Sequence, residues 1–183
     1  MIYILLVIGF TLLGYLIYMY NQFIKYQNLI ETSWADIDVY LTKRHELIPN
    51  LVNIVKGYLK HEKETLEAVV HARSEAIKSA EPNSQIPFEN EISSSLSKVF
   101  VLAEDYPDLK ANESFNKLHI ELTNVENEIA NARRYYNAVV RDNNNLRESF
   151  PSMIVGSLFN FKTEKFFEAP INTQKTVEIK LDD

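Results

Sequence analysis

Charged side chains interrupt an otherwise apolar helical pattern in the first third of the chain, and their types and spacing could support chemistry. Arg44, His45 and Glu46 are consecutive, and Asp38 precedes them by less than two helical turns. Arg133, in a later helical segment, is the fifth member of this candidate charge cluster. Such a cluster could bind a ligand or take part in catalysis, or it could pair internally in a buried ionic network that fixes helix register. Because most charges in such a pattern are paired or lie beside the apolar stripe, the structural interpretation is favoured.

Patterns for metal-dependent or nucleophilic catalysis are missing from the sequence. A di-iron helical bundle needs Glu three residues before His on two helices, but the residues three places before the four histidines are Thr42, Tyr58, Ala68 and Asn116. The pair His61-Glu62 lacks the second His of the zinc-protease helix motif. The chain has no Cys and only four Gly, which excludes thiolate metal sites and argues against phosphate-binding loops. We therefore predict no catalytic residue, no metal ligand and no cofactor.

Composition narrows the class of protein further. The chain of 183 residues carries 25 acidic and 19 basic residues, a net charge of −6. This balance argues against a nucleic-acid-binding protein, because such proteins usually present a basic surface. Four Gly and six Pro leave few turns, as is typical of long helices rather than of a sheet protein. We therefore expect an all-α chain with no nucleic-acid partner.

The first 24 residues carry no charged side chain, and Lys25 is the first charge in the chain. A helix of this length spans about 36 Å, enough to cross a hydrocarbon core of about 30 Å. A cleavable signal peptide is the alternative, but no basic residue precedes the run, and bulky residues follow it where a peptidase needs small ones. We predict a transmembrane anchor at residues 1–24. Lys25, Lys43 and Arg44 follow it, so the positive-inside tendency places the rest of the chain in the cytoplasm.

Apolar residues at helical spacing continue directly from the anchor to Tyr58, which predicts one helix rising out of the bilayer. Pro49 lies inside it and should bend the helix without ending it, because the apolar stripe resumes in phase. A second helix is expected to begin near His61. The segment 81–88, which contains two prolines, is expected to be a loop, and a third helix follows it by Ile92.

The fourth predicted helix has the most regular stripe: apolar residues keep heptad phase from Phe115 to Phe150, after an N-terminal cap at Asn112. The first and fourth helices are long, and the second and third are shorter. The predicted fold is therefore an N-terminal transmembrane helix that continues into an elongated antiparallel four-helix bundle with two long and two short helices. We assign residues 25–150 to this bundle and residues 171–183 to a disordered tail.

Near the membrane the two long helices have no short helices beside them, so we expect a two-stranded stalk with an exposed apolar stripe. In this stripe the first helix supplies Trp34, and the fourth helix supplies Tyr136 and the polar residue Asn143. The apolar segment 151–170 suits either the membrane interface or packing back onto the stalk, and the sequence does not choose between them. The candidate interface residues are Trp34, Tyr136, Asn143, Phe159 and Phe161.

Several separate blocks of this sequence occur in a recognisable order. They are W-A-D-I-D-V at residues 34–39, R-H-E-L-I-P-N-L-V at 44–52, Y-P-D-L-K-A-N at 106–112 and A-R-R-Y-Y-N at 132–137. Their order and spacing resemble the LemA family of bacterial membrane proteins. The resemblance covers about residues 1–168 and leaves the tail after Pro170 outside. One departure is the run Asn143-Asn144-Asn145, which stands where the family typically has an aromatic residue followed by Asn.

The resemblance implies an anchor in the bacterial inner membrane that carries an elongated helical bundle. It implies an amino terminus outside the cell membrane and a bundle in the cytoplasm, with no established enzymatic activity. It also implies an accessory role beside another membrane protein, such as a metalloprotease. The departure at Asn143 places a polar group on the heptad seam, where it is expected to fix register or partner choice.

The leading interpretation is a non-enzymatic, membrane-anchored scaffold or adaptor that engages its partners through the stalk. The expected partners are the lipid bilayer, a second copy of the chain, or another membrane protein. The alternative is a ligand-binding sensor or an enzyme that uses the charge cluster near Pro49. A third option is membrane remodelling through self-assembly of the anchor and the tail.

Overall fold

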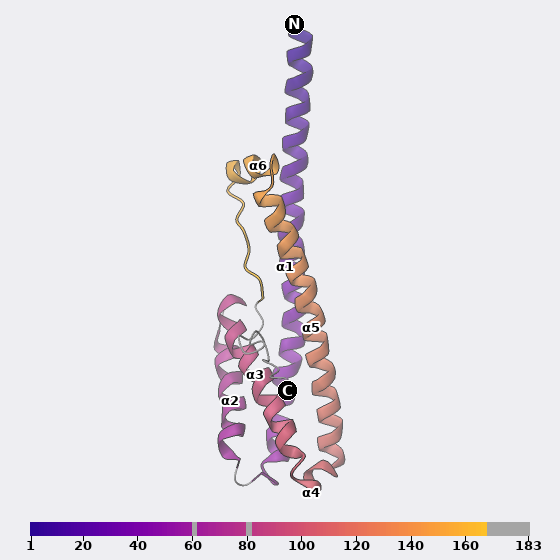
Figure 1. The fold of residues 1–183 in the computed structure, drawn as a ribbon, viewed down its shortest axis with the longest axis vertical. Helices are drawn as coiled ribbons and strands as arrows, with labels where there is room; N and C mark the ends of the chain where they lie inside the picture. Colours follow the sequence, from indigo (N-terminus) through magenta and orange to yellow (C-terminus); the bar gives the residue numbers. More distant parts are fainter. Residues whose placement is uncertain (60–61, 80–81, 168–183) are drawn as a thin grey trace, which may run out of the picture. The chain divides into compact units, whose positions relative to one another are not determined.

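The computed structural model describes residues 1–59, 62–79 and 82–167 (Figure 1). These residues contain helices and no strand, which confirms the all-α prediction. The helices are α1 (Ile2–Val55), α2 (Lys63–Lys78), α3 (Pro82–Ala103), α4 (Pro107–Lys110), α5 (Glu113–Glu148) and α6 (Ser152–Leu158). α2 begins at Lys63, two positions after the expected start. The expected disordered tail at 171–183 falls outside the described residues.

α1 is one continuous helix of 54 residues that includes Pro49. The predicted continuity between the apolar run and the stripe that follows it is therefore confirmed. The N-terminal part of α1 is long and apolar enough to cross a membrane, and none of its most apolar stretch is buried. Leu5, Phe10 and Leu12, for example, are 67%, 81% and 63% exposed. The rest of the chain thus leaves the most apolar stretch of the candidate membrane span uncovered.

The chain forms two compact units, which are described separately. The first unit consists of Met1–Asp38 and Ala130–Phe166, and the second consists of Val39–Ile129 together with Phe167. α1 and α5 each contribute residues to both units. α2, α3 and α4 belong to the second unit, and α6 belongs to the first.

The second unit is built around one apolar core, in which α2 and α3 lie side by side (Figure 1). Each helix supplies apolar residues three or four positions apart, so that they fall on one face. Fully buried members are Ile48, Leu51 and Val55 from α1, Val69, Ala72 and Ala76 from α2, Ile92 and Val99 from α3, Leu109 from α4, and Leu122 from α5. The predicted apolar stripes of these helices are the faces that are buried, except at Ile77 of α2, which was predicted on the stripe and is 54% exposed.

The first unit has a smaller core next to the candidate span. Phe23 of α1, Val155 of α6 and Phe161 are buried together. Tyr15, Met19, Ile24 and Leu146 pack against them and are partly buried. α6 therefore lies against α1 close to the place where the uncharged run ends (Figure 1).

The expected loop at 81–88 is wrong, because α3 begins at Pro82 and continues through Pro87. Proline at the first position of a helix loses no backbone bond, since the first four N–H groups of a helix have no intrahelical acceptor. Pro87 is exposed and lies in the second turn, so it removes a backbone bond only near the end of the helix. Two prolines close together therefore mark a helix start here, not a loop.

α5 begins where the sequence predicts. Asn112 Oδ1 accepts a hydrogen bond of 3.0 Å from the Phe115 N–H, which is the contact of an N-cap residue with the third residue of its helix. The heptad stripe is buried from Phe115 to Val139 except at Ala132, which is half-buried. Phe150, the last residue of the predicted stripe, lies beyond the end of α5 and is 79% exposed, because the chain turns there into α6.

Candidate functional site

Arg44 of α1 is buried in the second unit, with 1% of its side chain exposed. Its guanidinium pairs with the carboxylates of Glu89 on α3 and Glu126 on α5. It also donates hydrogen bonds to Ser93 Oγ at 2.7 Å and to the Glu89 carbonyl at 3.3 Å. Because a guanidinium presents five N–H donors in a rigid plane, this single side chain connects three helices. We call Arg44, His45, Glu89, Ser93 and Glu126 the buried ionic cluster.

Glu89 is the second buried charge of the cluster, with 2% of its side chain exposed. His45 Nε2 lies 2.9 Å from Glu89 Oε1, although the ring N–H is not aligned for a hydrogen bond. Gln85 Nε2 donates to the same carboxylate oxygen at 2.9 Å. Burial raises the pKa of Glu89, but His45 and Arg44 outweigh burial and hold this pKa below its ordinary value. Glu89 is therefore charged at neutral pH.

α2 joins the cluster through the backbone of α1. Arg73 Nε donates a hydrogen bond of 2.7 Å to the carbonyl oxygen of His45. In a regular helix that carbonyl would accept from the N–H four residues later, but Pro49 stands there and has no N–H. Pro49 therefore frees an acceptor inside α1, and Arg73 satisfies it.

Two buried nitrogens of the cluster have no hydrogen-bond acceptor within the described residues. They are Arg44 Nε and His45 Nε2. All other guanidinium contacts of Arg44 are made by its two terminal nitrogens. The arrangement can hold helices together through charge, and Arg44 Nε, which bonds to no acceptor in the described residues, is a position where an additional acceptor would be stabilised.

The structure distributes the predicted charge cluster over both units. Arg44 and His45 come together in the second unit around Glu89. Glu46 follows them in α1 and is exposed. Asp38 is exposed and Arg133 is half-buried, and both belong to the first unit.

The two acidic residues of the buried ionic cluster, Glu89 and Glu126, were not among the residues predicted from the sequence. Glu89 lies three residues before Ile92 on the buried face of α3, so extending the apolar stripe backwards would have found it. The expected loop at 81–88 hid that position. Glu126 follows Val125 on α5 and lies beside the buried stripe, where its charge gives no signal of its own.

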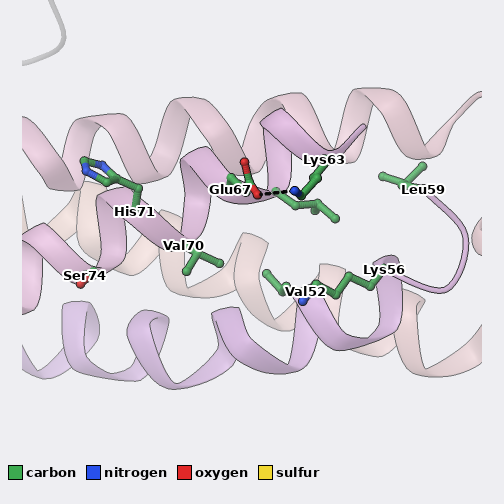
Figure 2. A pocket seen from close by; sticks show the side chains of 9 residues that line it. Val52, Lys56, Leu59, Lys63, Glu67, Val70, His71 and Ser74 are labelled. Atoms are coloured by element: carbon green, nitrogen blue, oxygen red, sulfur yellow. Dashed lines mark ion pairs between the residues drawn. The ribbon is translucent and has the colours of Figure 1, made fainter. Parts of the chain in front are cut away.

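A separate cavity of about 620 Å³ lies between the end of α1 and α2 in the second unit. Figure 2 shows apolar side chains of both helices along it and the ion pair of Lys63 with Glu67, 3.3 Å apart. Its lining consists of Val52, Lys56, Leu59, Lys63, Leu66, Glu67, Val70, His71 and Ser74. No member of the buried ionic cluster is among these residues. The described residues contain no group of three His, Cys, Asp or Glu side chains suited to a metal ion.

The five candidate interface residues all have contacts inside the first unit. The rings of Trp34 and Tyr136 meet edge to face, with centroids 5.6 Å apart. Phe161 stacks on Phe23 at 4.6 Å, and Phe159 meets Tyr20 edge to face at 4.9 Å.

The fifth residue, Asn143, is 3% exposed and donates to the Lys162 carbonyl at 3.4 Å. It belongs to a row of α5 side chains that bind the backbone of residues 161–165, which we call the returning segment. Arg147 Nε donates to the Phe161 carbonyl at 2.7 Å, and Asn144 exchanges hydrogen bonds of 2.9 and 2.8 Å with the Glu164 backbone. Tyr136 Oη donates to the Lys165 carbonyl at 3.2 Å; burial raises the pKa of this phenol, and Glu164 adds to the rise. The polar group on the heptad seam thus bonds to the chain's own returning segment.

Comparison with known proteins identifies the family. The sequence model of the LemA family matches residues 33–181 and so extends beyond Pro170 into the tail that was expected to lie outside the family match. Protein LemA of Metamycoplasma hominis is 24% identical over 150 residues, a stretch that covers 81% of this chain and 68% of the relative. Because the family model matches most of this sequence, the chain belongs to the LemA family.

Proposed function

We propose that this chain is a single-pass protein of the bacterial cell membrane that acts as a helical scaffold or adaptor. In this proposal the amino terminus lies outside, and the helical region stands in the cytoplasm. The chain performs no catalysis and binds other proteins through the first unit. Its partner is a second copy or another membrane protein, and the family resemblance adds a membrane metalloprotease to the candidates.

The observation that carries the proposal is the exposure of the apolar run in α1. Ile4, Phe10 and Leu13 are 65%, 81% and 54% exposed, and no residue of the most apolar stretch is buried. Soluble monomers rarely expose a continuous apolar surface of this extent, because each Å² in water costs about 25 cal/mol. A lipid bilayer removes that cost, because its hydrocarbon core surrounds the apolar run with lipid chains in place of water.

The buried ionic cluster supports a scaffold more than an enzyme. Arg44 pairs with both Glu89 and Glu126, and each of the three comes from a different helix. Charges paired in this way hold helices in register, as a protein that presents a fixed surface to a partner requires. The helix that carries Arg44 is the same helix that begins with the apolar run.

In-cell photo-cross-linking tests the adaptor role. A photo-reactive amino acid is placed at Tyr135, which is 53% exposed in the first unit, and separately at Val101, which is 67% exposed in the second. The proposal predicts a discrete product from Tyr135, with a second copy or one membrane protein, and no discrete product from Val101. Equal, diffuse labelling from both positions would contradict binding through the first unit.

A ligand-binding sensor is the second candidate function, and two buried nitrogens favour it: Arg44 Nε has no acceptor in the described residues, and His45 Nε2 lies 2.9 Å from Glu89 Oε1 without an aligned hydrogen bond. Both atoms can donate to an anion, so inorganic phosphate is a suitable probe in thermal unfolding. A phosphate-dependent rise in Tm that disappears in His45→Ala, while the Tm without phosphate is unchanged, would support a sensor. A lower Tm in His45→Ala with no phosphate effect in either protein supports the scaffold.

A further inference from the structure

α6 presents three large apolar side chains outward. Its buried residues are Ser152, Val155 and Gly156. Met153, Ile154 and Leu158 are 43%, 59% and 67% exposed, although each is a large apolar residue. A short helix on a water-exposed surface normally shows the opposite pattern, with polar residues outside. The outer face of α6 is therefore suited to an apolar environment.

The packing of α6 fixes its position along α1. A Cβ atom added to Gly156 would lie 3.0 Å from Phe23 Cζ, so α6 and α1 approach closely here. Immediately after α6, Phe159 meets the Tyr20 ring and Phe161 stacks on the Phe23 ring. Because the uncharged run ends before Lys25, α6 lies at the level where the candidate span ends.

Polar groups at the same level suit the headgroup layer. Arg147 Nε donates to the Phe161 carbonyl, and Ser152 Oγ bonds to the Leu146 carbonyl at 2.6 Å, so the turns on both sides of α6 have their backbone oxygens paired. Lys25 and Lys162 are both exposed. Basic side chains beside an apolar face are typical of helices that lie in the interface plane.

We propose that α6 lies in the interfacial layer of the membrane that α1 enters, with Ile154 and Leu158 inserted among the lipid chains. The proposed occupant of its outer face is phospholipid, because that face continues the exposed apolar surface of α1 within the same unit. This proposal rests on the membrane anchoring proposed above. α6 then acts as a collar that sets how deeply α1 enters the bilayer.

Depth-dependent fluorescence quenching tests this placement in the full chain, reconstituted in vesicles of phosphatidylcholine and phosphatidylglycerol. The chain has no Cys, so a single introduced Cys carries the fluorophore NBD without competing labels. Ile154→Cys and, independently, Leu158→Cys report on α6. Leu12→Cys reports on the candidate span, and Val101→Cys is an exposed apolar control in the second unit.

We expect doxyl groups high on the lipid chain to quench the labels at 154 and 158 more than deep doxyl groups do. The label at 12 should show the opposite order, and the label at 101 should not be quenched. Unquenched labels at 154 and 158 beside a quenched label at 12 would overturn the α6 proposal and leave the anchor standing. A blue-shifted but unquenched label at 154 would indicate a second copy over α6, which also overturns it. An unquenched label at 12 would mean that the anchor itself is wrong.

Discussion

Arg73 of α2 donates a 2.7 Å hydrogen bond to the backbone carbonyl of His45, the acceptor that Pro49 leaves unpaired in α1. A proline inside a helix normally weakens it, because it removes a backbone bond and crowds the preceding turn. Here the freed carbonyl becomes the contact for another helix. The cost of Pro49 to α1 is thus partly offset by docking of α2.

This relationship predicts that the effect of losing Arg73 depends on residue 49. Arg73→Ala leaves the His45 carbonyl buried without a donor and should lower the free energy of unfolding by about 1–3 kcal/mol. In a Pro49→Ala background the new N–H satisfies that carbonyl, so the same substitution should cost less. A double-mutant cycle by urea unfolding in detergent measures the difference. Equal costs of Arg73→Ala in the two backgrounds would contradict the role given to Pro49.

The Arg44–Glu89 pair predicts a large penalty for removing one partner. Arg44→Met leaves the Glu89 carboxylate buried beside fewer positive charges and should cost about 3–5 kcal/mol. The double variant Arg44→Met with Glu89→Leu should recover most of the loss, because the fully buried carboxylate is gone and Glu126, with 30% of its side chain exposed, can be hydrated. Lys43→Ala is the matched control: Lys43 pairs with Glu121 at 3.3 Å, with side chains 52% and 47% exposed, and its loss should cost less than about 1 kcal/mol. Similar costs for Arg44→Met and Lys43→Ala would argue against the buried cluster.

The lowered pKa of Glu89 predicts a loss of stability in acid. Its folded pKa lies below the unfolded value of about 4.3, so its contribution is fully present above that pH and is lost as the pH falls through the folded pKa. Glu89→Gln should therefore lower the free energy of unfolding at neutral pH and flatten its decline below about pH 4.3. Glu91→Gln, at an exposed position of α3, is the control and should retain the wild-type slope. If the unfolding free energy of Glu89→Gln declined in acid as steeply as that of the wild-type chain, this carboxylate would not be the source of the acid sensitivity.

Two glycines make a matched pair for the packing of α6. A Cβ at Gly156 would lie 2.7 Å from Arg147 Cδ and 3.0 Å from Phe23 Cζ, whereas one at Gly57 would meet its nearest atom at 3.6 Å. Gly156→Ala should therefore displace Arg147 and crowd Phe23, which loosens the packing of α6, and it should cost about 1–3 kcal/mol. Gly57→Ala should have little effect. Hydrogen exchange at Phe161 and Val155 measures the loosening, and equal protection in both variants would show that α6 does not depend on close contact at Gly156.

The sequence predicted the long helices well because their cores repeat every three or four residues, as from Phe115 to Val139. It also selected Arg44, since one charge in a long apolar stripe is conspicuous. It could not supply the partners, because Glu89 and Glu126 are 45 and 82 residues away and only the packing of helices brings them to Arg44. The prolines at 82 and 87 led to a wrong loop prediction, because proline is common both in loops and in the first turn of a helix.

The returning segment lay beyond sequence reasoning for another reason. Residues 161–165 have no helical or strand periodicity, and their backbone is held by α5 side chains such as Asn144. Asn143 could be recognised as a polar residue on the seam. Its acceptor, the Lys162 carbonyl, is a backbone atom, which no side-chain pattern identifies.

The most direct test of the account is the membrane association of a variant whose apolar run carries charges. Leu5→Lys combined with Leu12→Lys alters two exposed residues of α1, and Ile120→Lys, at a position 62% exposed on α5, is the control for an added surface charge. If the exposed run of α1 is the anchor, the double variant should appear in the soluble fraction after alkaline extraction of cell membranes, with its helical content retained, while Ile120→Lys and the wild-type chain stay in the membrane. Retention of the double variant in the membrane would contradict the claim that the exposed run of α1 is the anchor.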